Sequence, residues 1–195
     1  QAKYGLDHAT VGDLKITKRF VDAHNNVEHI YLTQENDGRS IFGSTISLSM
    51  KDGKLFSVGH RLVNVKDATY NSSQAKISAI DAINTVAKGF GIQNRAVPTF
   101  KKLMDNGLEV YDKADIALQD IPVELVYYAV SKGNYALAYK MQFDSPKNGT
   151  LYQSYVNAAT GALIKNDVLT VSCSFETTYL MHEDDCTDQV IQQEM

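Results

Sequence analysis

The stretch of residues 28–65 constrains the fold of this chain more than any other part of its sequence. Two Asp-Gly turns, with the glycines Gly38 and Gly53, separate three segments of extended character. An Asp-Gly pair between such segments is a strong signal for a β-hairpin, because glycine adopts a positive φ without steric cost. The middle segment alternates between apolar and small polar residues, which is typical of a strand with one buried face. The stretch therefore predicts an antiparallel meander whose apolar face packs against another part of the protein.

The pattern of apolar residues changes after this meander and then changes back. Apolar residues between positions 73 and 88 recur with the spacing of one helix face, and Ser73 is placed to cap the N-terminus of that helix. Segments with strand character follow at residues 123–130, 135–143, 150–156 and 162–169. A helix followed by antiparallel strands is an α+β pattern in which the helix lies across one sheet face. We therefore predict the α+β class, with two related helix-on-antiparallel-sheet modules and a truncated helix in the first.

Composition and charge argue against two classes of function. The chain has 195 residues, of which 44% are hydrophobic and 22% are charged, as is ordinary for a soluble globular protein. Its formal net charge of -4, without a cluster of Lys or Arg, argues against a nucleic-acid partner. The longest apolar run, residues 125–130, is far too short to cross a bilayer. We expect neither nucleic acid nor membrane among the partners of this chain.

Two cysteines and two sequons bear on where the protein is found. Cys173 and Cys186 either form a disulfide, worth about 3 kcal/mol for a short loop, or remain free thiols in a reducing compartment. Asn71 and Asn148 each begin an Asn-x-Ser/Thr acceptor triplet for glycosylation. Together the cysteines and the sequons predict a secreted, extracellular glycoprotein. The chain begins with Gln1 rather than Met, so we expect that an upstream part was removed or left out, and a signal peptide could have been in it.

The sequence lacks the motifs that would make the chain an enzyme. It has no Gly-x-Ser-x-Gly elbow, no phosphate-binding loop and no His-Glu-x-x-His. The pair His24 and His29 misses the inverted zinc motif by one residue, and it falls on a predicted turn and strand rather than on a helix. We therefore expect no catalytic residue, no metal ligand and no cofactor in this chain.

One acidic cluster near the C-terminus has the chemistry of a metal ligand set. It consists of His182, Glu183, Asp184 and Asp185. One interpretation is a solvated acidic loop that a disulfide closes. The other is that a carboxylate or the imidazole of this cluster reaches a metal ion in a partner protein.

A spaced motif in the predicted meander resembles a known family. A histidine, a tyrosine and a glutamine follow one another as His-x-Tyr-x-x-Gln, with the two Asp-Gly turns behind them. This stretch resembles the fungalysin/thermolysin propeptide (FTP) module, and the matching residues are His29, Tyr31, Gln34, Gly38 and Gly53. Arg39 and Ser40 depart from that family, which usually has an apolar residue and a proline after the turn glycine.

The second half of the chain is similar to the PepSY module that accompanies FTP. The similarity covers the helical segment, the strands after it and the stretch YVNAATG at residues 155–161. The two resemblances imply cystatin-like folds for both modules. They divide the chain into an FTP-like module at residues 1–66, a PepSY-like module at 67–171 and a tail with the possible disulfide at 172–195.

The resemblance implies that the chain is a propeptide. In this family the two modules form the pro-segment of secreted zinc metalloendopeptidase zymogens, where they act as protease inhibitor and folding chaperone. The implied partner is the catalytic domain of a thermolysin-like or fungalysin-type metallopeptidase, and that partner holds the zinc. Residues 182–185 would then form an inhibitory tail across its active-site cleft. One alternative stays open: a free-standing secreted binding module or trans-acting protease inhibitor that has lost its catalytic domain.

Overall fold

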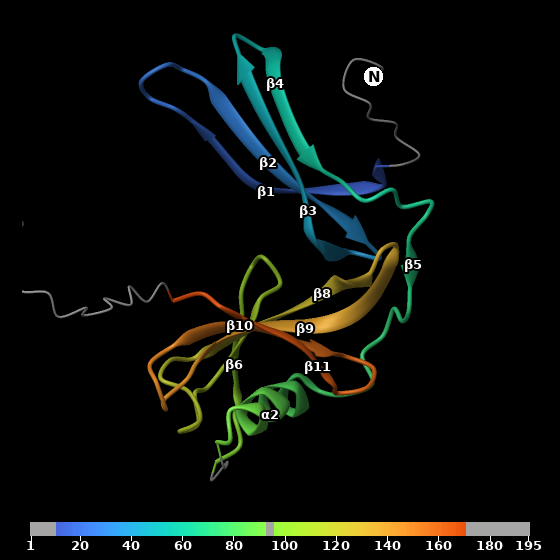
Figure 1. Ribbon diagram of the computed structural model, residues 1–195. Coiled ribbons are helices and arrows are strands. Elements are labelled where there is room, and N and C mark those ends of the chain that lie inside the picture. The colour runs from blue at the N-terminus through green and yellow to red at the C-terminus, as the bar shows by residue number, and fades with distance from the viewer. Residues whose placement is uncertain (1–10, 93–95, 171–195) are drawn as a thin grey trace, which may run out of the picture.

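Strands dominate the computed structural model of this protein, which describes residues 11–92 and 96–170 (Figure 1). One helix, α2 (Ala79–Gly89), lies wholly within that part of the chain. The strands are β1 (Asp13–Val21), β2 (Glu28–Asn36), β3 (Arg39–Lys51), β4 (Lys54–Arg61), β5 (Thr69–Tyr70), β6 (Phe100–Leu103), β7 (Glu109–Tyr111), β8 (Ile121–Ser131), β9 (Asn134–Asp144), β10 (Leu151–Asn157) and β11 (Leu163–Val168).

The first four strands, β1–β4, form an antiparallel meander, in which β1 joins the three strands that the sequence predicts for residues 28–65. β1 pairs with β2, β2 with β3, and β3 with β4, all antiparallel. The turns after β2 and β3 hold two residues each, and all four of these residues have a positive φ, which is +68° at Gly38. Turns of this kind twist in the same sense as the strands they join, so they favour hairpins. The two Asp-Gly pairs therefore set the turns of the meander.

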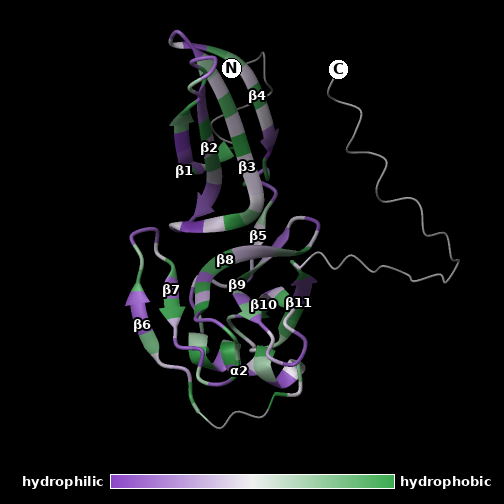
Figure 2. Ribbon diagram, turned by 90° about the vertical axis from the view of Figure 1, so that its left-hand side faces the viewer, coloured by the Kyte–Doolittle hydropathy of each residue, from purple (hydrophilic) through white to green (hydrophobic). Residues whose placement is uncertain are grey.

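The meander keeps much of its apolar surface in contact with solvent. Figure 2 shows apolar and polar residues alternating along its strands, as expected for side chains that point to opposite faces. Ile16, Leu32 and Ile46 lie side by side on one of these faces. Ile46, on the central strand β3, is 3% exposed, whereas Ile16, on the edge strand β1, is 56% exposed. The helix α2 packs on β9 and β10 instead of on this face.

The later strands form a sheet with α2 on one face. β8, β9, β10 and β11 pair antiparallel in that order, and β7 pairs with β8 on the other side. We call β7–β11 the helix-backed strands. The helix contributes one apolar face to their core, made of Ala79, Ala82, Ile83, Val86 and Ala87. This face packs against side chains of the sheet such as Leu137 and Phe143, both of which are fully buried.

Strand β3 connects the meander to the helix-backed strands. Beyond its pairing with β2, β3 pairs with β8 in parallel, and Ile41 lies opposite Tyr127. The register of β2 and β3 shifts between Thr33 and Glu35, and Gly43 has a φ of +79° in the same region. An irregularity of this kind bends a strand, and a positive φ suits glycine because it has no Cβ. β3 therefore leaves one group of strands and enters the other within its own length.

The predicted fold class, α+β with two cystatin-like helix-on-sheet modules, is wrong. The described residues form one mixed sheet of eleven strands, and within them α2 is the single complete helix. Among the described residues, only the sequence around α2 has a helical period. The meander therefore has no complete helix of its own in the part of the chain that the structure describes. The meander is also not a separate sheet, because β3 continues it into the helix-backed strands. The short helix expected before residue 11 lies outside the described residues.

The helix begins later than Ser73, the cap that the sequence predicts. Its N-cap is Ser78, whose hydroxyl accepts a hydrogen bond from the backbone N–H of Asp81 at 3.1 Å. The carboxylate of Asp81 in turn accepts from the backbone N–H of Ser78 at 3.0 Å. This reciprocal arrangement is a capping box, and it satisfies two N–H groups that the first turn leaves without helical partners. The Ser78 hydroxyl also donates to this carboxylate at 2.7 Å, and this bond, followed by the backbone one, lowers the pKa of the Asp81 carboxyl group.

Replacing Ser78 with alanine should lower the free energy of unfolding by about 1 kcal/mol, because the helix loses its N-cap. Urea denaturation followed by far-UV circular dichroism measures this loss. The matched control is Ser73→Ala, because Ser73 is exposed and lies outside the helix. We expect Ser73→Ala to leave stability unchanged, and equal losses in the two variants would contradict the assignment of Ser78 as the cap.

Candidate functional site

Gln34, the glutamine of the FTP-like motif, lies at the centre of a buried hydrogen-bond cluster. Its side chain is fully buried, and its Nε2 donates to the backbone oxygens of Val11 at 2.6 Å and Val63 at 2.9 Å. Its Oε1 accepts from the backbone N–H of Val63 at 2.7 Å and from the hydroxyl of Ser44. The side chain therefore joins β2 and β3 to the segments that precede β1 and follow β4.

The histidine and tyrosine of the same motif lie on the other face of the meander. The rings of His29 and Tyr31 stack with Phe20, with centroid distances of 5.2 and 6.2 Å. The ammonium group of Lys18 lies 4.9 Å from the centre of the Phe20 ring. Side chains alternate along β2, so these rings and Gln34 do not meet.

The two glycines of the motif, Gly38 and Gly53, lie in the hairpin turns at the two ends of β3. The five motif residues thus do not form one site.

The other predicted site residues are far from this motif or outside the described residues. Asn71 is exposed after β5, and Asn148 is exposed in the turn between β9 and β10. The side-chain oxygen of Asn148 accepts from the backbone N–H of Thr150 at 3.1 Å, and its amide donates to the hydroxyl of Tyr152 at 3.1 Å. Glycosylation at both positions stays a prediction. The remaining predicted site residues lie outside the described residues, and their roles stay predictions as well: Cys173, His182, Glu183, Asp184, Asp185 and Cys186.

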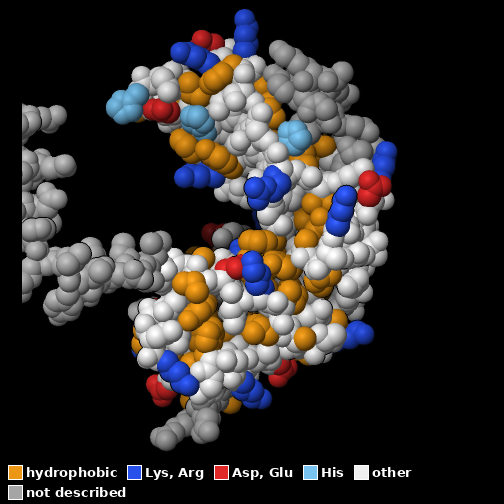
Figure 3. Space-filling model, viewed as in Figure 1, with side chains coloured by type: hydrophobic (Ala, Val, Ile, Leu, Met, Phe, Trp, Pro, Cys, Tyr) orange, Lys and Arg blue, Asp and Glu red, His pale blue; other side chains and the backbone are white. Residues whose placement is uncertain are grey.

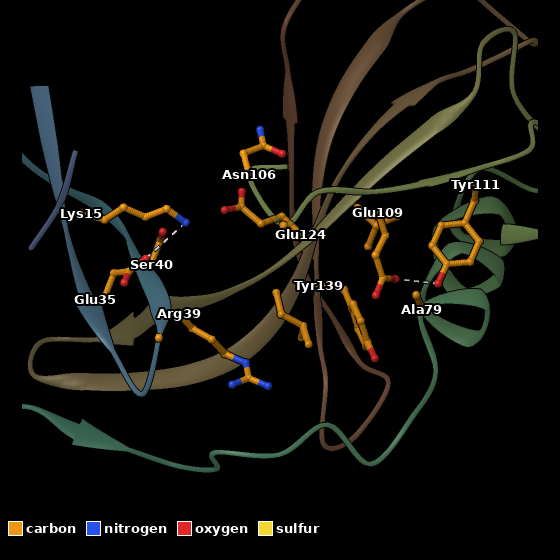
Figure 4. Close-up of a pocket in the computed structure, with 14 residues that line it drawn as sticks. Lys15, Glu35, Arg39, Ser40, Ala79, Asn106, Glu109, Tyr111, Glu124 and Tyr139 are labelled. Carbon is orange, nitrogen blue, oxygen red and sulfur yellow. Dashed lines mark hydrogen bonds and ion pairs between the residues drawn. The ribbon is translucent and has the colours of Figure 1, made fainter. Parts of the chain in front are cut away.

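A cavity of about 330 Å³ lies between the meander and the helix-backed strands (Figure 4). The meander contributes residues of β1, β2 and β3 to its wall, and β7, β8 and β9 contribute the opposite wall. Figure 3 shows the molecule hollowed between these two groups of strands, with Lys and Arg side chains on both sides of the hollow. The cavity wall includes the charged or phenolic side chains of Lys15, Glu35, Arg39, Glu109, Glu124 and Tyr139.

Three of the charges in this cavity wall, those of Lys15, Glu35 and Glu124, take part in ion pairs. Glu35 forms an ion pair with Lys15 at 3.5 Å. Glu124 forms one with Lys140 at 3.1 Å. Pairs of this type, with side chains partly open to solvent, contribute little to stability, but the cation of each pair offsets part of the field that its carboxylate produces in the cavity.

Two tyrosines of the cavity wall remain neutral phenols over the physiological pH range. Burial raises the pKa of Tyr111 well above its ordinary value, and the hydrogen bond that its hydroxyl donates to Glu109 at 2.7 Å acts in the same direction. Burial also raises the pKa of Tyr139, whose hydroxyl donates to the backbone oxygen of Ile77 at 2.8 Å. The charge of Glu109 raises the pKa of Tyr139 further, and the charge of Arg39 lowers it.

The cavity offers charges and hydrogen-bond donors for binding another molecule. Within residues 11–92 and 96–170, no group of three or more His, Cys, Asp or Glu side chains is arranged to hold a metal ion. In the same part of the chain, no helix has the length and apolar character needed to cross a membrane. In the sequence, Arg39 and Ser40 stand out only as departures from the FTP pattern, and Glu109, Glu124 and Tyr139 do not stand out as site residues. No local motif could have grouped these residues, because they lie up to 100 positions apart in the chain.

Two family models match parts of this strand-rich chain. The model described as "Fungalysin/Thermolysin Propeptide Motif" matches residues 12–62, which cover the meander. The model described as "Peptidase propeptide and YPEB domain" (PepSY) matches residues 114–167, which cover β8–β10 and nearly all of β11. The chain therefore carries an FTP motif followed by a PepSY domain, which confirms the predicted order of modules. Propeptide domains are non-catalytic, which supports the prediction that this chain is not an enzyme. No curated protein matches the chain.

Proposed function

We propose that this chain is the pro-domain of a secreted zinc metalloendopeptidase of the thermolysin or fungalysin type, and that it inhibits and helps to fold that enzyme. The observation that carries this proposal is the presence of two propeptide modules in series. The two exposed sequons at Asn71 and Asn148 favour an extracellular location. In this proposal residues 1–66 and 67–171 are the two modules, and residues 172–195 form the tail.

Open strand edges support a role in docking on a catalytic domain. Every residue of β1 and β6 is exposed, and each of these strands pairs with a neighbour on one side only among the described strands. The apolar side chains Phe100 and Leu103 of β6 are 55% and 63% exposed. A partner segment can add to such an edge through main-chain hydrogen bonds, and apolar neighbours then add contact area.

Covalent attachment would make modest contacts sufficient for inhibition. A tethered domain meets its partner at a high effective concentration, so its apparent affinity exceeds that of the separate domains. The tail, with His182, Glu183, Asp184 and Asp185, would reach the zinc-containing cleft in this arrangement. A template that binds the folding transition state of the peptidase would also increase its folding rate, which native-state stability alone does not do.

Inhibition is tested by adding the full chain to a mature thermolysin-like peptidase and measuring peptide hydrolysis. We expect inhibition at about 10 µM or below. The separate chain lacks the high effective concentration of a tethered domain, so its apparent affinity for the peptidase is lower than within one chain. A serine peptidase assayed in parallel is the control for specificity. Absence of inhibition at that concentration, or equal inhibition of the serine peptidase, would count against the proposed inhibitor.

The folding role needs a separate measurement. The same peptidase is denatured, diluted into buffer with or without the full chain, and assayed after removal of the chain. We expect a higher yield of active enzyme in the presence of the chain. Inhibition without this increase would favour the alternative, a trans-acting inhibitor that does not assist folding.

A further inference from the structure

We propose that the cavity between the meander and the helix-backed strands binds a zwitterion, namely a free amino acid or a short unblocked peptide, with its carboxylate on Arg39 and its ammonium group on Glu109. This site goes beyond the proposed pro-domain role and does not depend on it. The ligand would touch residues of both family-matched regions or their immediate neighbours.

The first observation is that two charges in the cavity wall lack a counterion. The charges of Lys15 and Glu35 neutralise each other, and Lys140 neutralises Glu124. Neither the guanidinium group of Arg39 nor the carboxylate of Glu109 forms an ion pair with any residue that the structure describes. Both residues are partly buried, and a charge that is partly removed from water without a counterion is costly. A ligand that brings the opposite charges would offset that cost.

The second observation is that the two charges lie on opposite walls of the cavity. Arg39 comes from the meander and Glu109 from the opposite wall, and Figure 4 shows the ring of Tyr139 between them. The charges of both residues act on the Tyr139 phenol, and they act in opposite directions. A ligand that spans from Arg39 to Glu109 would therefore lie across this ring.

The chemistry of each group fits one end of such a ligand. A guanidinium group binds a carboxylate through two parallel hydrogen bonds, and the neighbouring side chains of Ser40 and Asn106 add polar groups to the wall. One oxygen of Glu109 accepts from the hydroxyl of Tyr111, which leaves the other oxygen for an ammonium group. The cavity volume of about 330 Å³ falls at the lower end of the range for small-molecule sites.

A ligand with a single charge fits this pair less well. A simple anion on Arg39 would leave Glu109 unpaired and would face its negative charge, and a simple cation would meet the reverse problem at Arg39. A zwitterion satisfies both groups at once. Because its two ends would bind opposite walls, it would favour the arrangement in which these walls face each other. If the proposed pro-domain role holds, short unblocked peptides are also what the partner peptidase releases.

The probe is the dipeptide dialanine, titrated into the full chain by calorimetry and by NMR. N-acetyl-dialanine carries only the carboxylate, and dialanine amide carries only the ammonium group. The test variants are Arg39→Gln and Glu109→Gln, which remove one charge each. The matched control is Arg61→Gln, because Arg61 is exposed and lines a different cavity.

We expect dialanine to bind the natural chain, and each test variant to weaken its binding by about tenfold or more, as the loss of one charge-assisted contact predicts. Arg61→Gln should leave the affinity unchanged. N-acetyl-dialanine should bind more weakly than dialanine, and Glu109→Gln should not weaken its binding but strengthen it, because the variant removes a negative charge that faces the ligand. In the natural chain, dialanine should shift the amide signals of Ser40, Asn106 and Tyr139.

Several outcomes would overturn the proposal. These are no binding of dialanine at about 10 mM, equal binding of dialanine and its N-acetyl form, or affinities unchanged in both test variants. Circular dichroism confirms that each variant is folded. If a variant does not fold, the signal shifts in the natural chain decide, because shifts confined to residues outside the cavity also contradict the site.

Discussion

Replacing Gln34 with alanine should destabilise the protein by about 3–5 kcal/mol, the sum of several buried polar groups that lose their partners. The Gln34 side chain makes four hydrogen bonds in a position closed to solvent, two of them to Val63. Its removal leaves the hydroxyl of Ser44 and the backbone N–H of Val63 without these bonds.

The measurement is urea denaturation followed by far-UV circular dichroism, with Gln142→Ala as the control. Gln142 is an exposed residue of β9, so the same chemical change there should alter stability by about 0.5 kcal/mol or less. Amide hydrogen exchange in β1–β4 should also become faster in Gln34→Ala. A loss below about 1 kcal/mol would show that the buried cluster does not hold the meander together.

Replacing Phe143 with alanine should cost about 3–5 kcal/mol, because it leaves a cavity in the core beneath α2. Phe143 is fully buried, and its ring stacks on that of Phe90 just beyond the helix, with centroids 5.5 Å apart. The loss combines the apolar contacts of the ring with the space that the neighbours fill only in part.

Phe56 provides the matched control for this substitution. It lies in β4 and is 59% exposed, so Phe56→Ala removes the same atoms from a site that water already reaches. We expect a change of about 0.5 kcal/mol or less in the urea denaturation of Phe56→Ala. Similar losses in the two variants would contradict the described core.

The local elements of this fold could be predicted from the sequence because their signals are local. The Asp-Gly pairs predict the turns at Gly38 and Gly53, and both have the expected positive φ. The helical period before Gly89 predicts α2. The start of α2 was misplaced because Ser73 and Ser78 are both plausible caps, and the decisive signal was the aspartate three residues after Ser78.

The arrangement of these elements could not be predicted in the same way. The parallel pairing of Ile41 with Tyr127 joins residues more than 80 positions apart, and no residue pattern within either strand indicates it. The cavity combines side chains from Lys15 to Tyr139, so its charges meet only in the folded chain. Among the cavity residues, Gly38 stood out in the sequence as a turn glycine of the FTP-like motif, and Arg39 and Ser40 stood out as departures from the FTP pattern.

The course of β3 has a consequence for how the two propeptide regions could be separated or exchanged. A cut in the chain between β4 and β5 falls between the two family-matched regions. It would nevertheless remove β3, the strand that pairs with β8. The isolated second region would then expose a fresh edge along β8, which is a site for unwanted pairing with other chains. A transplant of that region into another protein would therefore have to bring residues 39–43 with it, or supply a substitute strand in their place.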